Sequence, residues 1–171
     1  SKREQELNSL VESAPDNIIR YDLDCRAVFV NRMMEQTSSA TSSSLIGKTP
    51  IESKFDGLMG IENYEEKLRR VISTGEPDDV DLVMLDREGG IILHNVCFVA
   101  ERTYHFCFIA ERNSEGDIIG ALAFGRDITA RKQAEEDLRV AAIALDSHEA
   151  IAITDANKSI IKVNQSFTKI T

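Results

Sequence analysis

Apolar residues recur at two different periods along this chain, and the helical period marks two segments. Residues 3–14 place apolar side chains three and four positions apart, which predicts a helix that ends before Pro15. Residues 62–74 show the same spacing, with charged side chains on the opposite face. On that charged face we expect Glu65 to pair with Arg69, and Glu66 with Arg70, each one turn later. The apolar face, which could cover a sheet, consists of Tyr64, Leu68, Val71 and Ile72.

Two short strand-like segments joined by an Asp-rich turn predict a β-hairpin near the start of the chain. Residues 17–22 and 27–30 are the two predicted strands, and the Asp side chains between them can bond their own backbone in a turn. Asn31 then stands where a helix begins, so its side chain can cap a short helix over residues 32–37. The Ser- and Thr-rich residues 37–44 are typical of a loop.

Further strands are predicted in the second half of the chain. Residues 80–85 and 91–100 flank a turn at residues 86–90, whose two glycines are typical of a hairpin, and residues 118–124 form a later strand. A near-repeat within residues 97–112 leaves room for two strands, so either the hairpin is extended or an extra strand is present. The order of elements indicates an α+β domain in which helices cover one face of an antiparallel sheet.

A highly charged helix is predicted to follow the last strand. Between residues 130 and 147, apolar side chains step by four, three and four positions, with oppositely charged pairs beside them. This spacing favours a parallel dimer contact, and the alternative is a linker helix packed on its own domain. The seam consists of Ala134, Leu138, Ala141 and Leu145.

An internal repeat connects the two ends of the chain. Residues 18–38 align with residues 151–171 at an offset of 133 positions. A period this long indicates tandem domains rather than a stacked array. The alternative is two unrelated strand–turn–strand units that share Asp and Asn turns. The identical pairs include Ile18 with Ile151, Asp22 with Asp155, Val30 with Val163 and Asn31 with Asn164.

Two short motifs resemble a known family. Residues 125–129 read Gly-Arg-Asp-Ile-Thr and lead directly into the charged helix, and residues 45–49 read Leu-Ile-Gly-Lys-Thr. The first resembles the end of a PAS sensory domain, where Asp-Ile-Thr closes the last strand and opens a signalling helix. The second resembles the segment between the short helices of that family. The resemblance implies a PAS fold, with an antiparallel sheet of about five strands, helices on one face, and linker helices at both ends.

The resemblance also divides the chain into four parts. It implies a linker helix over residues 1–14, a PAS domain over residues 15–129, a signalling helix over residues 130–147, and the start of a second PAS domain over residues 148–171. The second copy resembles PAS domains that precede domains for cyclic-di-GMP synthesis and hydrolysis. Histidine kinases use similar segments.

Composition argues against several classes of protein. The net charge of −9 is opposite to that of a nucleic-acid interface, which needs clustered Lys and Arg. The chain lacks the run of about 18 apolar residues that a membrane span needs, so we expect no membrane contact. Cys25, Cys97 and Cys107 show no Cys-x-x-Cys spacing, which suits free, buried thiols in a reducing compartment. A first residue of Ser without a signal peptide indicates a cytoplasmic piece of a longer protein, whose remainder can hold membrane segments.

No pattern of a catalytic or metal site is found in the sequence. Residues 45–49 resemble a phosphate-binding loop, but Ser42 stands where that loop needs glycine. Haem-binding PAS domains take a His from the long helix, and residues 62–74 contain none. Cys25 lacks the motif that forms a flavin adduct. The cofactor is therefore left unknown, with no haem or flavin signature and a small organic ligand as the open alternative.

The candidate functional residues fall into two groups. Arg126, Asp127 and Thr129 form a candidate signal relay, since Asp127 can accept backbone amides at the start of the outgoing helix and Thr129 can cap it. The alternative is that they are only a good helix start. The candidate pocket residues, whose alternative role is core packing, are Phe55, Tyr64, His94, Phe106 and Phe108.

Together these features predict a non-enzymatic sensory module of a bacterial signalling protein. A small ligand or a partner protein would alter the sheet, and the change would pass through the C-terminal helix to an output domain in the same protein. Cyclic-di-GMP turnover is the favoured output and a histidine kinase the second. We expect a homodimer through the linker helices and the sheet. The alternative is a ligand-free PAS module for dimerisation or interaction.

Overall fold

The computed structural model describes residues 2–55, 58–93, 96–146, 152–156, 158 and 160–163. These residues form two units, with the boundary between Thr129 and Ala130. The first unit holds the sheet and the candidate sites. The second holds most of a helix and a separate hairpin.

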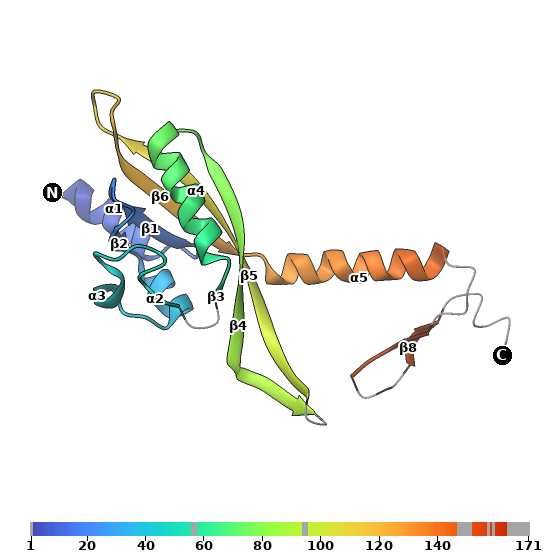
Figure 1. Ribbon diagram of the computed structural model, residues 1–171. Coiled ribbons are helices and arrows are strands. Elements are labelled where there is room, and N and C mark those ends of the chain that lie inside the picture. Colours follow the sequence, from blue (N-terminus) through green and yellow to red (C-terminus); the bar gives the residue numbers. More distant parts are fainter. Residues whose placement is uncertain are drawn as a thin grey trace. The chain divides into compact units, whose positions relative to one another are not determined.

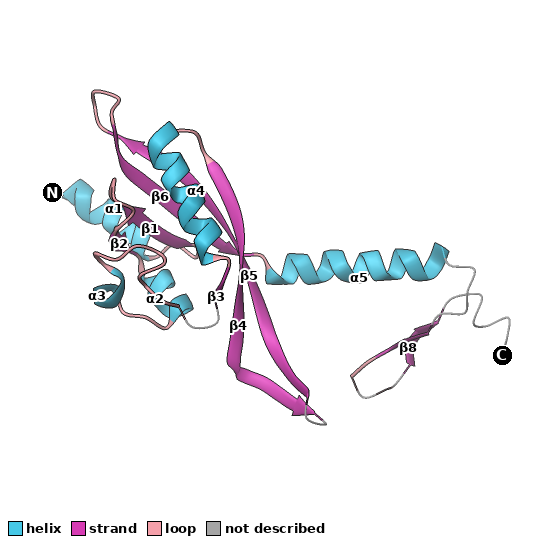
Figure 2. Ribbon diagram, in the orientation of Figure 1, coloured by secondary structure: helices cyan, strands magenta, loops and turns pink. Residues whose placement is uncertain are grey.

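A six-stranded antiparallel sheet organises the described part of the first unit, with the strand order β2-β1-β6-β5-β4-β3 (Figure 2). The predicted α+β class is confirmed. The sheet exceeds the expected five strands because β3, a two-residue strand, pairs with β4 at one edge. The strands are β1 (Asn17–Tyr21), β2 (Ala27–Val30), β3 (Leu58–Met59), β4 (Asp78–Leu93), β5 (Val96–Arg112) and β6 (Ile118–Asp127).

Helix α4 (Ile61–Thr74) packs across one face of this sheet (Figure 1). Its predicted apolar face is confirmed, because Leu68 and Val71 are completely buried. The segment 37–44 is not entirely the loop that its composition predicts: a one-turn helix begins there, and its Leu45 is buried in the core. The other helices of the unit are α1 (Lys2–Glu12), α2 (Arg32–Ser38) and α3 (Ser42–Leu45).

Glu65 departs from the predicted pattern of α4, because it is buried rather than exposed with the other charged residues. Its carboxylate accepts a hydrogen bond from the backbone N–H of Ile51 at 2.9 Å, and it forms the predicted pair with Arg69 at 2.6 Å. Burial acts to raise the pKa of Glu65, but these hydrogen bonds outweigh it and the pKa is lowered. The packing of a distant segment, rather than the helical period, therefore sets the position of Glu65.

Strands β4 and β5 form a long hairpin, and the predicted turn within it is wrong. The glycine-containing residues 86–90 lie inside β4, where the pairing register shifts between Asp86 and Ile91. The near-repeat lies on a single strand of 17 residues, so the hairpin is extended and no extra strand is formed within residues 96–112. Pairing continues past the glycines because a bulge absorbs the additional residues of β4.

Helix α5 (Thr129–Asp146) begins at the last residue of the first unit and continues into the second. Its start and length agree with the helix that the charged heptad pattern predicts. Within the described residues, no helix combines the length and the apolar character needed to cross a membrane.

The second unit also contains a two-stranded sheet, formed by β7 (Ala152–Thr154) and β8 (Ile160–Val163). Once the offset of 133 positions is applied, the register of this hairpin equals that of β1 and β2, including a shift at the same place. The turn residues Cys25 and Lys158 correspond as well, with φ angles of 62° and 64°. The sequence repeat therefore pairs equivalent backbone positions of the two hairpins.

Candidate functional site

A small cavity of about 30 Å³ lies in the first unit between the helices and the sheet. This volume holds about two water molecules, whereas pockets for small organic ligands measure about 300–1,000 Å³. A larger ligand therefore fits only if the lining side chains move apart. The lining is formed by Asn17, Ile19, Tyr21, Met34, Thr37, Ser38, Pro50, Phe55, Leu58, Ile61, Tyr64, Leu82, Met84, Tyr104 and Phe106.

Two tyrosine hydroxyls meet in the wall of this cavity. The hydroxyl oxygens of Tyr21 and Tyr64 are 3.1 Å apart and form a hydrogen bond between β1 and α4. Burial raises the pKa of both phenols, so both remain protonated at physiological pH. The ring of Tyr64 packs edge-on against Phe106 and Phe108, with centroid distances of 5.1 and 4.7 Å. This hydrogen bond within an aromatic cluster therefore helps to hold α4 on the sheet.

Asn17 and Thr37 add a second polar pair to a lining that is mostly apolar. The Thr37 hydroxyl donates a hydrogen bond to Oδ1 of Asn17 at 2.9 Å, and Asn17 is buried at the start of β1. Apolar walls with a few placed polar groups are typical of small-molecule sites. The chemistry of the wall therefore suits a mainly apolar ligand with one or two polar atoms.

The structure places the five predicted pocket residues in three different environments. Phe55, Tyr64 and Phe106 line the cavity. Phe108 is completely buried beside Tyr64 but is not part of the lining. His94 lies outside the described residues. Tyr21 is the functional candidate that sequence reasoning missed, although its position on the inward face of an alternating strand was a usable signal.

The junction between the sheet and α5 is held by three residues. The backbone N–H of Thr103 on β5 donates to Oγ1 of Thr129 at 3.0 Å, and this hydroxyl donates to Oδ1 of Asp127 at 2.5 Å. The backbone N–H of Thr129 donates to the same oxygen of Asp127 at 2.9 Å. Because α5 begins at Thr129, these bonds connect β5 to the first residue of the helix.

Arg126, the third predicted relay residue, connects the end of β6 to the entry of the domain. Its guanidinium donates to both carboxylate oxygens of Asp16, at 3.1 and 2.7 Å. Asp16 immediately precedes β1, so the pair links two positions that lie 110 residues apart in sequence. Arg126 is largely exposed, so the pair adds little to the stability of the fold, and it joins the start of β1 to the end of β6.

The buried side chain of Asn31 links the N-terminal elements through hydrogen bonds. Its Oδ1 accepts hydrogen bonds from the backbone N–H groups of Ile18 and Met34, at 2.9 and 3.2 Å. Its Nδ2 donates to the carbonyl oxygens of Val11 and Asp16, at 3.2 and 3.0 Å. The predicted cap of α2 is thus confirmed. The other three bonds were missed, because the local sequence does not reveal that this side chain is buried.

Comparison with known proteins shows which family this fold belongs to. A family model described as the PAS fold matches residues 11–133. No curated protein matches the chain.

Similar solved structures include VqmA of Vibrio cholerae in a complex with ligand and DNA, at 22% identity and a TM-score of 0.58. The match covers 73% of this chain and 51% of the VqmA chain, so the present chain spans about half of VqmA. The PAS domain of Bordetella pertussis BvgS is 22% identical, with a TM-score of 0.55 and coverage of 85% of this chain and 100% of that one. A PAS domain from Colwellia psychrerythraea is 16% identical, with a TM-score of 0.54 and coverage of 76% and 99%. At these identities the similarities show the fold alone.

Proposed function

We propose that this chain, which belongs to the PAS family, is a sensory and regulatory module that passes a change in its sheet through α5 to an output domain. The observation that carries the proposal is the position of β5. This strand lines the cavity with Tyr104 and Phe106, and its Thr103 holds the first residue of α5 through Thr129. One strand therefore contacts both the candidate input site and the output helix. Differential binding of a few kcal/mol between two states is enough to drive such a switch.

The proposed input is a small molecule that separates the side chains around the cavity. We expect native mass spectrometry of the purified chain to show mass in excess of the 19.1 kDa polypeptide. The variant Phe106→Trp fills the cavity, so it is expected to lose this excess mass. Phe124→Trp places the same side chain on the next strand, outside the cavity lining, and should retain the bound molecule. Loss in both variants would show that the molecule does not occupy the cavity.

A second candidate function is a ligand-free module for dimerisation or interaction. The specific observation in its favour is that the protein's own side chains nearly fill the space between helices and sheet. They leave a cavity of only about 30 Å³. A clean mass without ligand in the same measurement, at twice the mass of the chain, would favour this second function.

The relay role of Asp127 gives a prediction for hydrogen exchange. In Asp127→Ala, Thr129 loses the acceptor of its backbone N–H and of its hydroxyl. The loss of these two hydrogen bonds, at about 1 kcal/mol each, should speed amide exchange in the first turn of α5 about 30-fold. Exchange in the paired part of β5 should stay unchanged, because none of its ladder hydrogen bonds is removed. Hydrogen exchange read by mass spectrometry measures both segments.

Asp22→Ala is the matched control for this prediction. Asp22 also accepts two backbone hydrogen bonds, from Asp24 and Arg26, but in the β1–β2 turn. It should leave exchange in α5 unchanged. If Asp127→Ala accelerates exchange equally in β5 and α5, Asp127 is a general stabiliser and not a relay.

We propose that the chain forms a homodimer through the heptad seam of α5. We also propose that the protein is cytoplasmic. Leu138 of that seam is 72% exposed in the single chain, which supports such a contact. The equivalent hairpin geometry supports a second PAS module that begins near residue 148. Cyclic-di-GMP turnover is the proposed output and a histidine kinase the next. VqmA, whose structure holds ligand and DNA, adds a DNA-binding output as a third proposal.

A further inference from the structure

A cysteine, a histidine and an aspartate form a hydrogen-bonded row on the sheet, apart from the cavity. Nδ1 of His105 lies 2.7 Å from Oδ1 of Asp81, and Nε2 of His105 lies 3.4 Å from Sγ of Cys107. The register of the β4–β5 ladder places His105 directly opposite Asp81. The row therefore results from strand pairing, since Asp81 is 24 residues from His105 in sequence.

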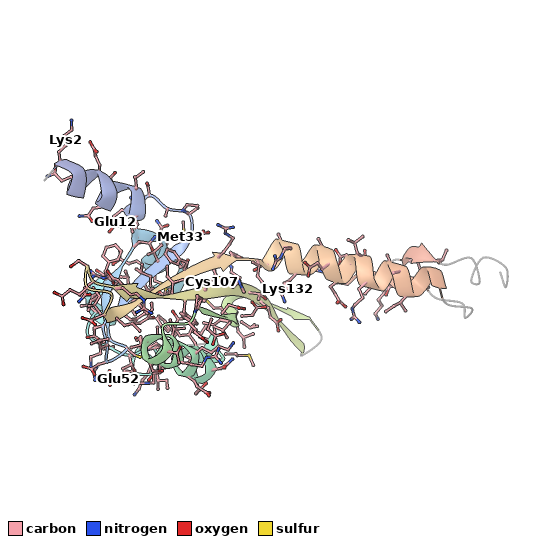
Figure 3. All side chains as sticks on the ribbon, turned by 90° about the horizontal axis from the view of Figure 1, so that it is seen from above. Lys2, Glu12, Met33, Glu52, Cys107 and Lys132 are labelled. Atoms are coloured by element: carbon pink, nitrogen blue, oxygen red, sulfur yellow. The ribbon has the colours of Figure 1, made fainter. Side chains whose placement is uncertain are left out.

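These three side chains lie on the face of the sheet opposite to the core. Tyr104, Phe106 and Phe108 of β5 point inward and are buried, so the alternating residues His105 and Cys107 point outward. Cys107 is exposed, contrary to its prediction as a buried hydrophobe, and Figure 3 labels it on the sheet. About a third of the His105 side chain and more of Asp81 are accessible. Small reagents can therefore reach the sulfur.

The hydrogen bonds assign a role to each member of the row. The carboxylate of Asp81 can only accept, so Nδ1 of His105 carries a proton, and in this tautomer of the neutral ring Nε2 can accept the thiol proton. Burial raises the pKa of the Cys107 thiol, so the resting group is the thiol and its proton must leave during reaction. A nucleophile, a base and a group that orients the base are the parts that nucleophilic catalysis by cysteine requires. The two imidazole nitrogens face different partners, which is the geometry of proton transfer rather than of a shell around a metal ion.

We propose that Cys107 is a base-assisted reactive thiol that is oxidised by hydroperoxides. As the sulfur attacks the terminal oxygen, its proton moves to Nε2 of His105, the S–O bond forms and the O–O bond breaks. The departing alkoxide takes the proton from His105, so the products are the sulfenic acid of Cys107 and an alcohol, or water when the reagent is hydrogen peroxide. Sulfur loses two electrons and the peroxide gains them. A hydroperoxide fits this site better than an alkylating agent, because its leaving oxygen needs the proton that His105 has just accepted.

The test uses hydrogen peroxide as the oxidant and dimedone to trap the sulfenic acid. Peptide mapping by mass spectrometry gives a rate constant for each cysteine in the folded chain. We expect Cys107 to react faster than the buried Cys25, and His105→Gln to slow Cys107 about 100-fold, as is typical for loss of a general base. Reaction of Cys107 at the rate of free cysteine, or an unchanged rate in His105→Gln, would overturn the proposal.

Variants of two aspartates on β4 distinguish a role of Asp81 in positioning His105 from a general effect of negative charge near the thiol. Asp81 holds His105, whereas Asp79 lies opposite Cys107 in the ladder and raises the pKa of its thiol. Asp81→Asn should slow the oxidation and Asp81→Glu should restore it. Asp79→Asn removes the same charge but should not slow the reaction. Equal slowing by both Asn variants contradicts the assigned role of Asp81. The inference needs neither the cavity nor the relay, so it can stand or fail independently of the proposed function.

Discussion

Replacing Phe108 with alanine is expected to lower the free energy of unfolding of the first unit by about 3–5 kcal/mol. The side chain is completely buried, and its ring packs edge-on against Tyr64 at 4.7 Å. Truncation removes this contact and leaves a cavity between β5 and α4, which the surrounding side chains fill only in part. Since small domains are stable by about 5–15 kcal/mol, this loss is a large fraction of the total. Urea denaturation followed by circular dichroism measures it.

Phe124→Ala is the matched control on the neighbouring strand. Phe124 lies on β6, and its side chain is partly exposed rather than buried in the core. We expect Phe124→Ala to lower the free energy of unfolding by less than half as much as Phe108→Ala does. Similar losses in the two variants would show that the helix-covered face is not the principal core.

The second large effect is expected for Asn31→Ala. The substitution removes a completely buried side chain that bonds two backbone N–H groups and two carbonyl oxygens. Each buried group left without a partner costs about 1–3 kcal/mol, and water can reach some of them. We therefore expect a loss of about 2–4 kcal/mol, measured by the same denaturation experiment. Amide exchange at Ile18 and Met34 should also become faster.

Asn113→Ala tests whether burial is the cause. The Asn113 side chain also accepts two backbone hydrogen bonds, from Glu115 and Asp117, but in an exposed turn. Water can replace these bonds, so its loss should be about 1 kcal/mol or less. If Asn113→Ala is as destabilising as Asn31→Ala, the effect comes from the turn and cap hydrogen bonds alone and not from burial.

Much of the fold was predictable because its elements follow local periods. The strand segments and the Asp-containing turn between them predicted β1 and β2 closely, and the three- and four-residue spacing predicted α4 together with its buried Leu68 and Val71. The predictions that were wrong depend on distant residues. Glu65 is buried, where its carboxylate accepts a hydrogen bond from the backbone N–H of Ile51, and residues 86–90 stay within β4 because the opposite strand continues to pair with it.

The candidate sites were predictable in part. Arg126, Asp127 and Thr129 could be proposed as a group because they are neighbours in sequence, whereas their partners Asp16 and Thr103 could not be predicted. The two-residue spacing of His105 and Cys107 puts both on one face of a strand, but this signal was not used, and Cys107 was expected to be buried. The spacing could not place Asp81 next to them, because the bulge at residues 86–90 hides the register of the hairpin.

Periodicity was thus sufficient to specify the α+β class and the order of most elements, and the short motifs were sufficient to show a resemblance to the family and to locate the junction between the sheet and α5. These features depend on residues within a few positions of one another, where the backbone geometry is known in advance. The small volume of the cavity, the hydrogen bond between Tyr21 and Tyr64, and the row of Asp81, His105 and Cys107 were decided by the packed structure. They depend on strand register and on the close packing of side chains from distant segments, which no local pattern encodes.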